Sequence, residues 1–289
     1  MGYLHIDNLY KDQTILIFKQ CYAMEKIHGT SAHIKWNPIE QKISFFSGGE
    51  SYANFIALFN LESLTKLLLE IFPNSNVVIY GEAYGGKQQG MSATYGKDLK
   101  FICFDVQVGD SWLNVPSAEK VCASLGLEFV DYVQVSTDID RLNAERDRDS
   151  IQAVRNGCGS GKKREGVVLR PLTEFTMNNG KRVICKHKRD EFMETKTPRV
   201  VSQEEFKIME DAKAIVEEWV TETRLNHVLD KLPIGISTES TKIVIDAMIE
   251  DVYREAKNEI VESRELTKLI GSKTAMMFKD KLKNEIAAI

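Results

Sequence analysis

The sequence lacks the features that mark secreted, membrane-spanning and zinc-binding proteins. Its 289 residues include only five cysteines, and none of them forms a C-x-x-C pair. An odd number of widely spaced cysteines argues against a disulfide framework or a zinc site and fits a reducing compartment. The N-terminus shows no basic stretch followed by an apolar one, and no apolar run approaches the roughly 18 residues that span a bilayer. We therefore expect a protein of the cytoplasm without a membrane partner.

An excess of positive charge is also missing. The chain has 38 Lys and Arg against 42 Asp and Glu, which gives a formal net charge of −4. Such a chain can bind nucleic acid only through a local basic surface, because its total charge does not attract a polyanion. Apolar residues make up 43% of the chain, enough for a core, and the length favours two domains.

Two kinds of pattern follow one another along the chain. The first two-thirds alternate as strands do; residues 32–36 and 42–46, for example, flank a turn-like Asn-Pro and predict a hairpin. After residue 198 the apolar residues recur at helical spacing without a strand pattern. We predict an α+β domain over residues 1–198 and a small all-helical domain over residues 199–289. Further strands are expected at 77–80, 99–108, 167–170 and 182–186, and helices at 58–72, 117–125, 203–220, 239–262 and 272–286.

The most specific motif is Glu-Lys-Ile-His-Gly-Thr at residues 25–30, between an apolar stretch and an expected strand. Its glycine would let a backbone or a ligand approach Lys26 closely. A lysine nucleophile must be neutral, and burial or neighbouring cations lower the usual lysine pKa of about 10.4. The alternative is an ordinary junction between a strand and a loop.

Three carboxylates lie at the ends of expected strands. Glu82 lies between two glycines, Asp105 follows Phe104 in an apolar strand, and Glu165 directly precedes a buried strand. For the Asp105 segment, a buried core strand is the plainer interpretation, and it is at least partly correct.

A pair of lysines completes the set. Lys186 and Lys188 are two residues apart, so in a strand both side chains point to the same face. Two like charges on one face are unfavourable unless an anion such as phosphate lies between them. The alternative is a solvated face of the strand.

In this order, the five segments resemble the covalent nucleotidyltransferases, the superfamily of polynucleotide ligases and mRNA capping enzymes. The resemblance covers about residues 20–190 and implies a fold of antiparallel sheets with flanking helices. DNA ligases and capping enzymes usually have aspartate where this chain has His28. The histidine and the helical C-terminal part are instead similar to the nick-sealing branch of the ATP-dependent RNA ligases, which includes ligases of T-even bacteriophages.

The resemblance implies roles for individual residues. Lys26 would be the nucleophile that carries AMP, Phe104 would stack on the adenine, and Glu25 would contact it. The implied catalytic residues are Lys26, His28, Glu165, Lys186 and Lys188, and the implied nucleotide-binding residues are Glu25, Lys26, Ile27, Gly29, Glu82, Phe104, Glu165, Lys186 and Lys188. Glu165 and Glu82 would hold Mg²⁺ or Mn²⁺ through water.

The implied reaction is the ATP-dependent joining of RNA ends. AMP would pass from Lys26 to a 5′-phosphate, and a 3′-OH would then displace it. The expected partner is RNA with 3′-OH and 5′-phosphate ends, as in a nicked duplex. The basic residues expected to contact this RNA are Arg164, Arg182, Arg189, Lys273 and Lys279. For the last two, a solvated helix face is an equal alternative.

Other interpretations stay open. A DNA ligase or a GTP-dependent capping-type enzyme would use similar motifs, and a degenerate RNA-binding module would keep the fold without catalysis. The sequence also departs from the family in one place. The family has a basic residue, usually Arg, on the strand after the first motif, but residues 42–50 contain no Arg. Either Lys42 or a residue elsewhere substitutes, or the contact to the terminal phosphate of the substrate differs.

Overall fold

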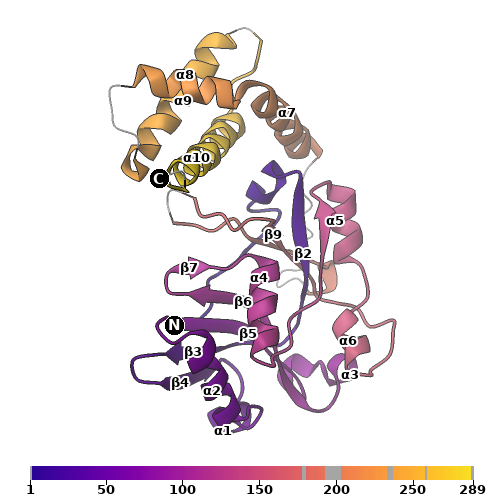
Figure 1. Ribbon diagram of the computed structural model, residues 1–289. Coiled ribbons are helices and arrows are strands. Elements are labelled where there is room, and N and C mark those ends of the chain that lie inside the picture. Colours follow the sequence, from indigo (N-terminus) through magenta and orange to yellow (C-terminus); the bar gives the residue numbers. More distant parts are fainter. Residues whose placement is uncertain (1, 178–179, 193–202, 233–236, 258, 288–289) are drawn as a thin grey trace. The chain divides into compact units, whose positions relative to one another are not determined.

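The chain divides into two compact units (Figure 1). The computed structural model describes residues 2–177, 180–192, 203–232, 237–257 and 259–287. The first unit comprises Met1–Phe175 and Val183–Pro198, and the second comprises Thr176–Arg182 and Arg199–Ile289. A division by sequence at residue 198 thus differs from the structure in one short segment, Thr176–Arg182, which groups with the helical unit.

Two five-stranded sheets form the framework of the first unit. The first sheet has the order β1-β10-β9-β2-β8 and the second the order β4-β3-β5-β6-β7. Neighbouring strands run antiparallel, apart from the two-residue β1, which runs parallel to β10. The strands are β1 (Asp7–Asn8), β2 (Gln20–Lys26), β3 (Thr30–Asn37), β4 (Lys42–Ser47), β5 (Val77–Gly85), β6 (Leu99–Val108), β7 (Ser111–Trp112), β8 (Tyr132–Ser136), β9 (Gly166–Pro171) and β10 (Cys185–Lys188). The predicted α+β class with antiparallel sheets is confirmed.

Short helices flank these sheets. They are α1 (Tyr52–Ile56), α2 (Leu61–Ile71), α3 (Ser92–Tyr95), α4 (Val115–Ser124), α5 (Ile139–Arg146) and α6 (Ile151–Arg155), with 3₁₀ turns η1 (Thr14–Ile17), η2 (Gln88–Gly90) and η3 (Asp190–Phe192). The helix expected over residues 58–72 begins at Leu61, because the side chain of Asn60 caps it by accepting a hydrogen bond from Ser63 N at 3.0 Å.

The main core of the first unit lies on one face of the second sheet. Along β3, Ile34 and Trp36 are fully buried, and they pack with Ile79 of β5, Leu68 of α2 and other apolar residues. Alternation along a strand sends the intervening side chains of β3 to the opposite face. The opposite face of the second sheet therefore remains available for a site.

The last expected strand of the first unit is shifted. Residues 182–186 were expected to be extended, but β10 covers Cys185–Lys188. Arg182 instead forms an isolated antiparallel bridge with Thr176. The shift places Lys188 at the end of the strand.

From residue 203 onward, the described part of the second unit consists of helices joined by turns and short loops. Its helices are α7 (Gln203–Trp219), α8 (Glu222–Lys231), α9 (Thr241–Glu255) and α10 (Arg264–Ala287), with the turn η4 (Thr238–Ser240). The helix expected from residue 272 begins at Arg264, and the preceding Ser263 accepts a hydrogen bond from Leu266 N at 3.1 Å. Within the described residues, no helix is both long enough and apolar enough to cross a membrane.

Candidate active site

The carboxylate of Glu165 gathers three side chains at the edge of the first sheet. Lys26 ends β2, and strand pairing sets it opposite Gly166, the residue after Glu165. The Lys26 Nζ donates to Glu165 Oε2 at 2.8 Å, and His28 Nδ1 lies 2.9 Å from the same oxygen. The Nζ of Lys188, from the neighbouring β10, lies 2.9 Å from Glu165 Oε1. Residues from three strand ends thus meet at one carboxylate.

This environment keeps Glu165 ionised. Its side chain is buried, and burial alone would raise its pKa. Hydrogen bonds from His28, Lys26 and Lys188, together with the charge of Lys26, outweigh burial and lower the pKa to about 2. The carboxylate is therefore negative at neutral pH and offsets the repulsion between the two lysines.

Glu82 is a second carboxylate beside this group, and its pKa shifts the other way. It lies on β5, half-buried, and its Oε1 accepts a hydrogen bond from Gly29 N at 3.1 Å. Burial raises its pKa to about 7; the charge of Lys26 opposes the rise, and the charge of Glu165 adds to it. Only glycine fits at position 29, since a Cβ there would lie 2.3 Å from the carbonyl oxygen of Ala83.

Glu82 should make the folded state less stable as the pH rises. Its folded pKa of about 7 exceeds the usual 4.5, so the unfolded chain releases the proton first. Between about pH 4.5 and pH 7 this difference lowers the free energy of unfolding, and above pH 7 the loss is complete. Glu82→Gln cannot ionise and escapes this loss. We therefore expect the free energy of unfolding of the variant, relative to that of the wild type, to be higher at pH 8 than at pH 5. Urea unfolding at both pH values measures this, and an unchanged difference between the two proteins would contradict the shifted pKa.

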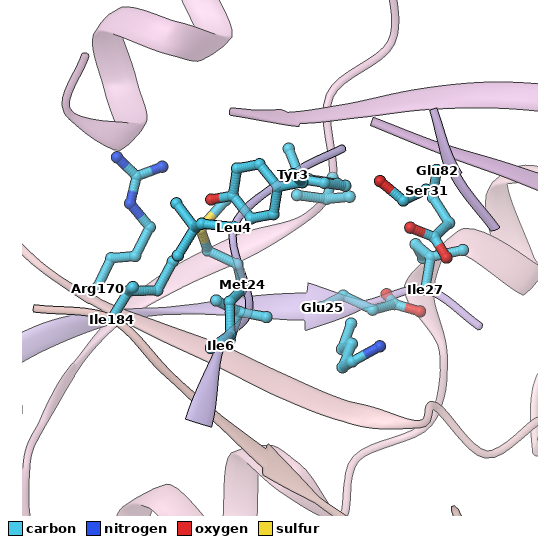
Figure 2. A pocket seen from close by; sticks show the side chains of 14 residues that line it. Tyr3, Leu4, Ile6, Met24, Glu25, Ile27, Ser31, Glu82, Arg170 and Ile184 are labelled. Carbon is cyan, nitrogen blue, oxygen red and sulfur yellow. The ribbon is translucent and has the colours of Figure 1, made fainter. Parts of the chain in front are cut away.

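A cavity of about 190 Å³ opens beside these carboxylates. Its walls come from both sheets and from the N-terminal segment, and they are Tyr3, Leu4, Ile6, Met24, Glu25, Lys26, Ile27, Ser31, Glu82, Phe104, Val130, Val168, Arg170 and Ile184. Figure 2 shows Glu82 and Ser31 on one side of the cavity, Arg170 and Ile184 on the other, and Tyr3 between them. A largely apolar cavity with charged groups at one side suits a flat ring attached to a polar group.

The N-terminal segment is part of this wall, which the sequence did not indicate. The ring of Tyr3 packs at 4.9 Å edge-on against Phe104, and at 5.0 Å from the ring of Tyr80. The Tyr3 hydroxyl donates to Asp105 Oδ2 at 2.6 Å, and Arg170 donates to Asp105 Oδ1 at 3.0 Å. Asp105 is fully buried, so it joins the two sheets behind Phe104 and supports that ring.

Five of the predicted nucleotide-binding residues line the cavity, while Gly29, Glu165, Lys186 and Lys188 are not among its lining residues. Lys26, Ile27, Glu82 and Phe104 line it. Glu25 lines it as well, but its carboxylate accepts hydrogen bonds from the Ser150 hydroxyl and from the backbone N–H groups of residues 151 and 152. The Glu25 carboxylate therefore holds the start of α6, and a contact with adenine would have to compete with these bonds.

Lys186 belongs to the same side of the site as Lys188. Strand pairing places Lys186 opposite Val168, which lines the cavity, and Lys188 opposite Gly166. Residues directly opposite each other in an antiparallel pair share a face of the sheet. The two lysines thus share one face, as their spacing predicted, and this face is the cavity side of the first sheet.

The residues predicted to contact RNA are used inside the fold. Arg164 and Arg189 are buried and donate to backbone carbonyls, Arg164 to Asp149 and Arg189 to Arg146 and Arg148. In the second unit Arg182 is buried, and the ammonium groups of Lys273 and Lys279 donate to the carbonyls of residues 216 and 176 at 3.2 and 3.1 Å. These internal contacts leave the role of the five side chains in RNA binding untested, and it stays a prediction.

Comparisons with known proteins agree with this geometry. A family model described as RNA ligase matches residues 19–188, and no curated protein sequence matches the chain. One similar solved structure is a variant of the Naegleria gruberi RNA ligase with ATP and Mn; it is 16% identical over 67% of this chain and 57% of that chain, with a TM-score of 0.52. Another variant of that enzyme, with AMP and Mn, is 16% identical over 66% and 57% of the two chains, with a TM-score of 0.50.

The two kinds of comparison carry different conclusions. The chain spans 57% of the length of the solved ligases that it matches, and at 16% identity this likeness shows a shared fold. The family model is more direct, because it covers more than half of the chain and includes Lys26, Glu82, Glu165 and Lys188. The chain therefore belongs to the RNA ligase family.

Proposed function

We propose that this chain is an ATP-dependent RNA ligase that joins a 3′-OH to a 5′-phosphate through an AMP bound covalently to Lys26. The observation that carries the proposal is the position of Lys26 Nζ, which lines the cavity and donates to Glu165 at 2.8 Å. Membership of the RNA ligase family supports the reaction class. The Naegleria gruberi structures with ATP or AMP support the choice of nucleotide.

The first step transfers AMP to the enzyme. The Lys26 amine loses a proton and attacks the α-phosphate, so that a nitrogen–phosphorus bond forms and pyrophosphate leaves with the electrons of the broken bond. Glu165 has a pKa of about 2 and is a poor base, so it orients Nζ rather than taking its proton. Lys186 and Lys188, on the cavity side of β10, stabilise the charge that develops on the phosphates.

The next two steps join the RNA. An oxygen of the 5′-phosphate attacks the lysyl-bound AMP, and the Lys26 nitrogen regains a proton as its bond to phosphorus breaks. The 3′-OH then attacks the activated 5′-phosphate, loses its proton, and AMP leaves. His28 binds the same Glu165 oxygen as Lys26, and this closeness to the proposed nucleophile supports a role for its imidazole in the sealing step.

The cavity suits the remaining parts of ATP. The adenine fits between apolar side chains, with Phe104 as a stacking partner held by Tyr3, and Met24 and Val168 on the first sheet. Glu82 lines the same cavity and is close enough to Lys26 for the charge of the ammonium to lower its pKa. The ribose hydroxyls would donate to its carboxylate.

A divalent cation fits the carboxylates without a dedicated cluster. Within the described ranges, no group of three or more His, Cys, Asp and Glu side chains is placed to hold a metal. Mg²⁺ usually takes only one or two carboxylates, with waters and substrate phosphates as its other ligands. Glu82 and Glu165 are close enough for the charge of one to raise the pKa of the other, so this pair would hold Mg²⁺ or Mn²⁺. When bound, the cation would neutralise charge on the phosphates.

Ligation with matched substrates tests the proposal. We would offer the wild-type protein ATP or GTP, and 5′-labelled nicked duplexes in which the strands at the break are RNA or DNA. Sealing of RNA that requires ATP is expected. A preference for GTP with no sealing would identify a capping-type enzyme, and sealing of DNA ends alone would identify a DNA ligase. RNA binding without sealing or AMP transfer would leave only a degenerate RNA-binding module.

A further inference from the structure

The cavity face of the second sheet continues beyond the cavity and becomes exposed toward β4, at Lys35, Ser44 and Phe46. Along β3, Ile34 and Trp36 point into the core, so the alternate residues Ser31, His33 and Lys35 share the other face. Ser31 lines the cavity. From Ser31 to Lys35 the strand rises about 13 Å, so a single strand of nucleic acid could contact both ends of this face.

Aromatic rings form a row across this face. Pairing places His33 opposite Phe46 of β4 on one side and Tyr80 of β5 on the other. The rings of Phe46 and His33 are stacked, with centroids 5.0 Å apart and planes 19° apart. Behind them, Tyr80 lies 5.6 Å from His33 and 5.4 Å from Trp112. Phe46 ends the row, and its side chain is 40% exposed. It is thus a supported aromatic ring that faces solvent.

Positive charge accompanies the exposed ring. Lys42 and Ser44 alternate with the inward-facing residues of β4 and share the face of Phe46, and Lys35 lies opposite Ser44. Both lysines are exposed. Neither β3 nor β4 contains an acidic residue. The face therefore complements an anion, and an exposed aromatic ring among lysines is the pattern that binds bases and backbone of single-stranded nucleic acid.

We propose that Phe46, Lys35 and Lys42 form a stacking platform for one nucleotide of the RNA strand beside the break. Phe46 stacks on the base, and the two lysines lie near the backbone phosphates. The inference rests on the proposed RNA ligase function and names how the substrate strand is held. It also gives a role to Lys42. The family has a basic residue, usually Arg, after its first motif, and Lys42 is the basic residue that residues 42–50 of this chain provide in its place.

RNA binding by variants of Phe46 tests the platform. The probe is an RNA with a 5′-phosphate end and 2-aminopurine at successive positions near the break, because stacking quenches its fluorescence. Loss of stacking costs about 1–3 kcal/mol per base, so Phe46→Ala should bind about tenfold more weakly and lose the quenching at one position. Phe46→Trp should keep both, and Phe46→Leu should behave like Phe46→Ala. Unchanged affinity in Phe46→Ala, or full recovery in Phe46→Leu, would overturn the proposal and leave the face to a protein partner.

Two controls distinguish a loss of stacking in the Phe46 variants from misfolding and from a failure of the proposed ligase function. Tyr52 is 63% exposed on α1, whose Phe55 packs on Phe45 at the opposite face of the sheet, so Tyr52→Ala should leave RNA affinity unchanged. AMP transfer to the protein without RNA is measured in parallel and should be equal in all Phe46 variants. If the wild type forms no adenylate, the proposed function fails, while the binding titration still decides on the platform.

The salt dependence of RNA binding tests the two lysines of the platform. Lys35→Gln and Lys42→Gln should each reduce the slope of log affinity against log salt by about 0.7 to 1, because each lysine releases a counterion from the RNA. An unchanged slope in both variants would remove the lysines from the platform.

Discussion

Lys26→Ala should form no adenylated protein and should seal no RNA from a free 5′-phosphate, yet still join RNA whose 5′ end already carries AMP. The nitrogen of Lys26 is the atom that bonds to phosphorus in the first step, and alanine offers no nucleophile. The last step needs only the 3′-OH and the activated phosphate, with Lys188 and His28 still held by Glu165. The measurement compares sealing of the two RNA substrates by the same preparation.

A matched variant makes this comparison decisive. Lys66→Ala removes an exposed lysine of α2, on the core side of the second sheet, and should act as the wild type on both substrates. If Lys26→Ala still sealed free 5′-phosphate ends, another group would be the nucleophile. Loss of joining with both RNA substrates in a protein that still unfolds cooperatively would mean that Lys26 also serves the last step.

Glu165→Gln should have the second largest effect, on both AMP transfer and stability. The substitution keeps the shape of the side chain but removes the negative charge that Lys26, Lys188 and His28 all contact. Removing one member of a buried ion pair typically costs 3–5 kcal/mol, since the partner is left uncompensated. We expect a loss of about 3 kcal/mol in the free energy of unfolding at pH 7 and a fall in AMP transfer of at least about a hundredfold.

The pH dependence of the free energy of unfolding distinguishes the loss of the Glu165 charge from a simple packing defect. The folded pKa of Glu165 is about 2, below the usual 4.5, so its stabilisation is complete above about pH 4.5 and is lost as the pH falls toward 2. The gap in stability between wild type and Glu165→Gln should therefore narrow from pH 7 to pH 3. Glu62→Gln, which neutralises an exposed carboxylate of α2, should show no such change. A gap that stayed constant with pH would indicate lost packing instead of lost charge.

Strand patterns and strand-end residues were predictable from the sequence. The hairpin of β3 and β4 was expected from alternation and a turn, and pairing of residues 32–37 with 42–47 confirms it. Lys26 and Glu165 were each expected at a strand end, which is where they lie, whereas Lys188 lies at the end of a strand that was expected to stop at residue 186. Their mutual distances were not predictable, because they depend on β9 pairing with both β2 and β10.

Other parts of the site depend on tertiary contacts that leave no local pattern. Tyr3 and Asp105 are 102 residues apart, and nothing near either residue indicates that the hydroxyl meets the carboxylate. The hydrogen-bond partners of the basic residues were equally unpredictable from the sequence. Arg189 and Lys279 counted as candidate phosphate contacts by charge alone, but the structure binds both to backbone carbonyls. Phe46 shows the reverse, since a ring in an apolar strand pattern faces solvent.

The central claim is that Lys26 carries AMP, and intact mass spectrometry tests it most directly. The protein is incubated with ATP and Mg²⁺, denatured, weighed, and digested to locate any added group. We predict a gain equal to one adenylyl group, located on the peptide that contains Lys26, lost in mild acid as a phosphorus–nitrogen bond is, and absent from Lys26→Ala. A folded wild-type protein that gains no mass, or gains it on another residue, would contradict the account.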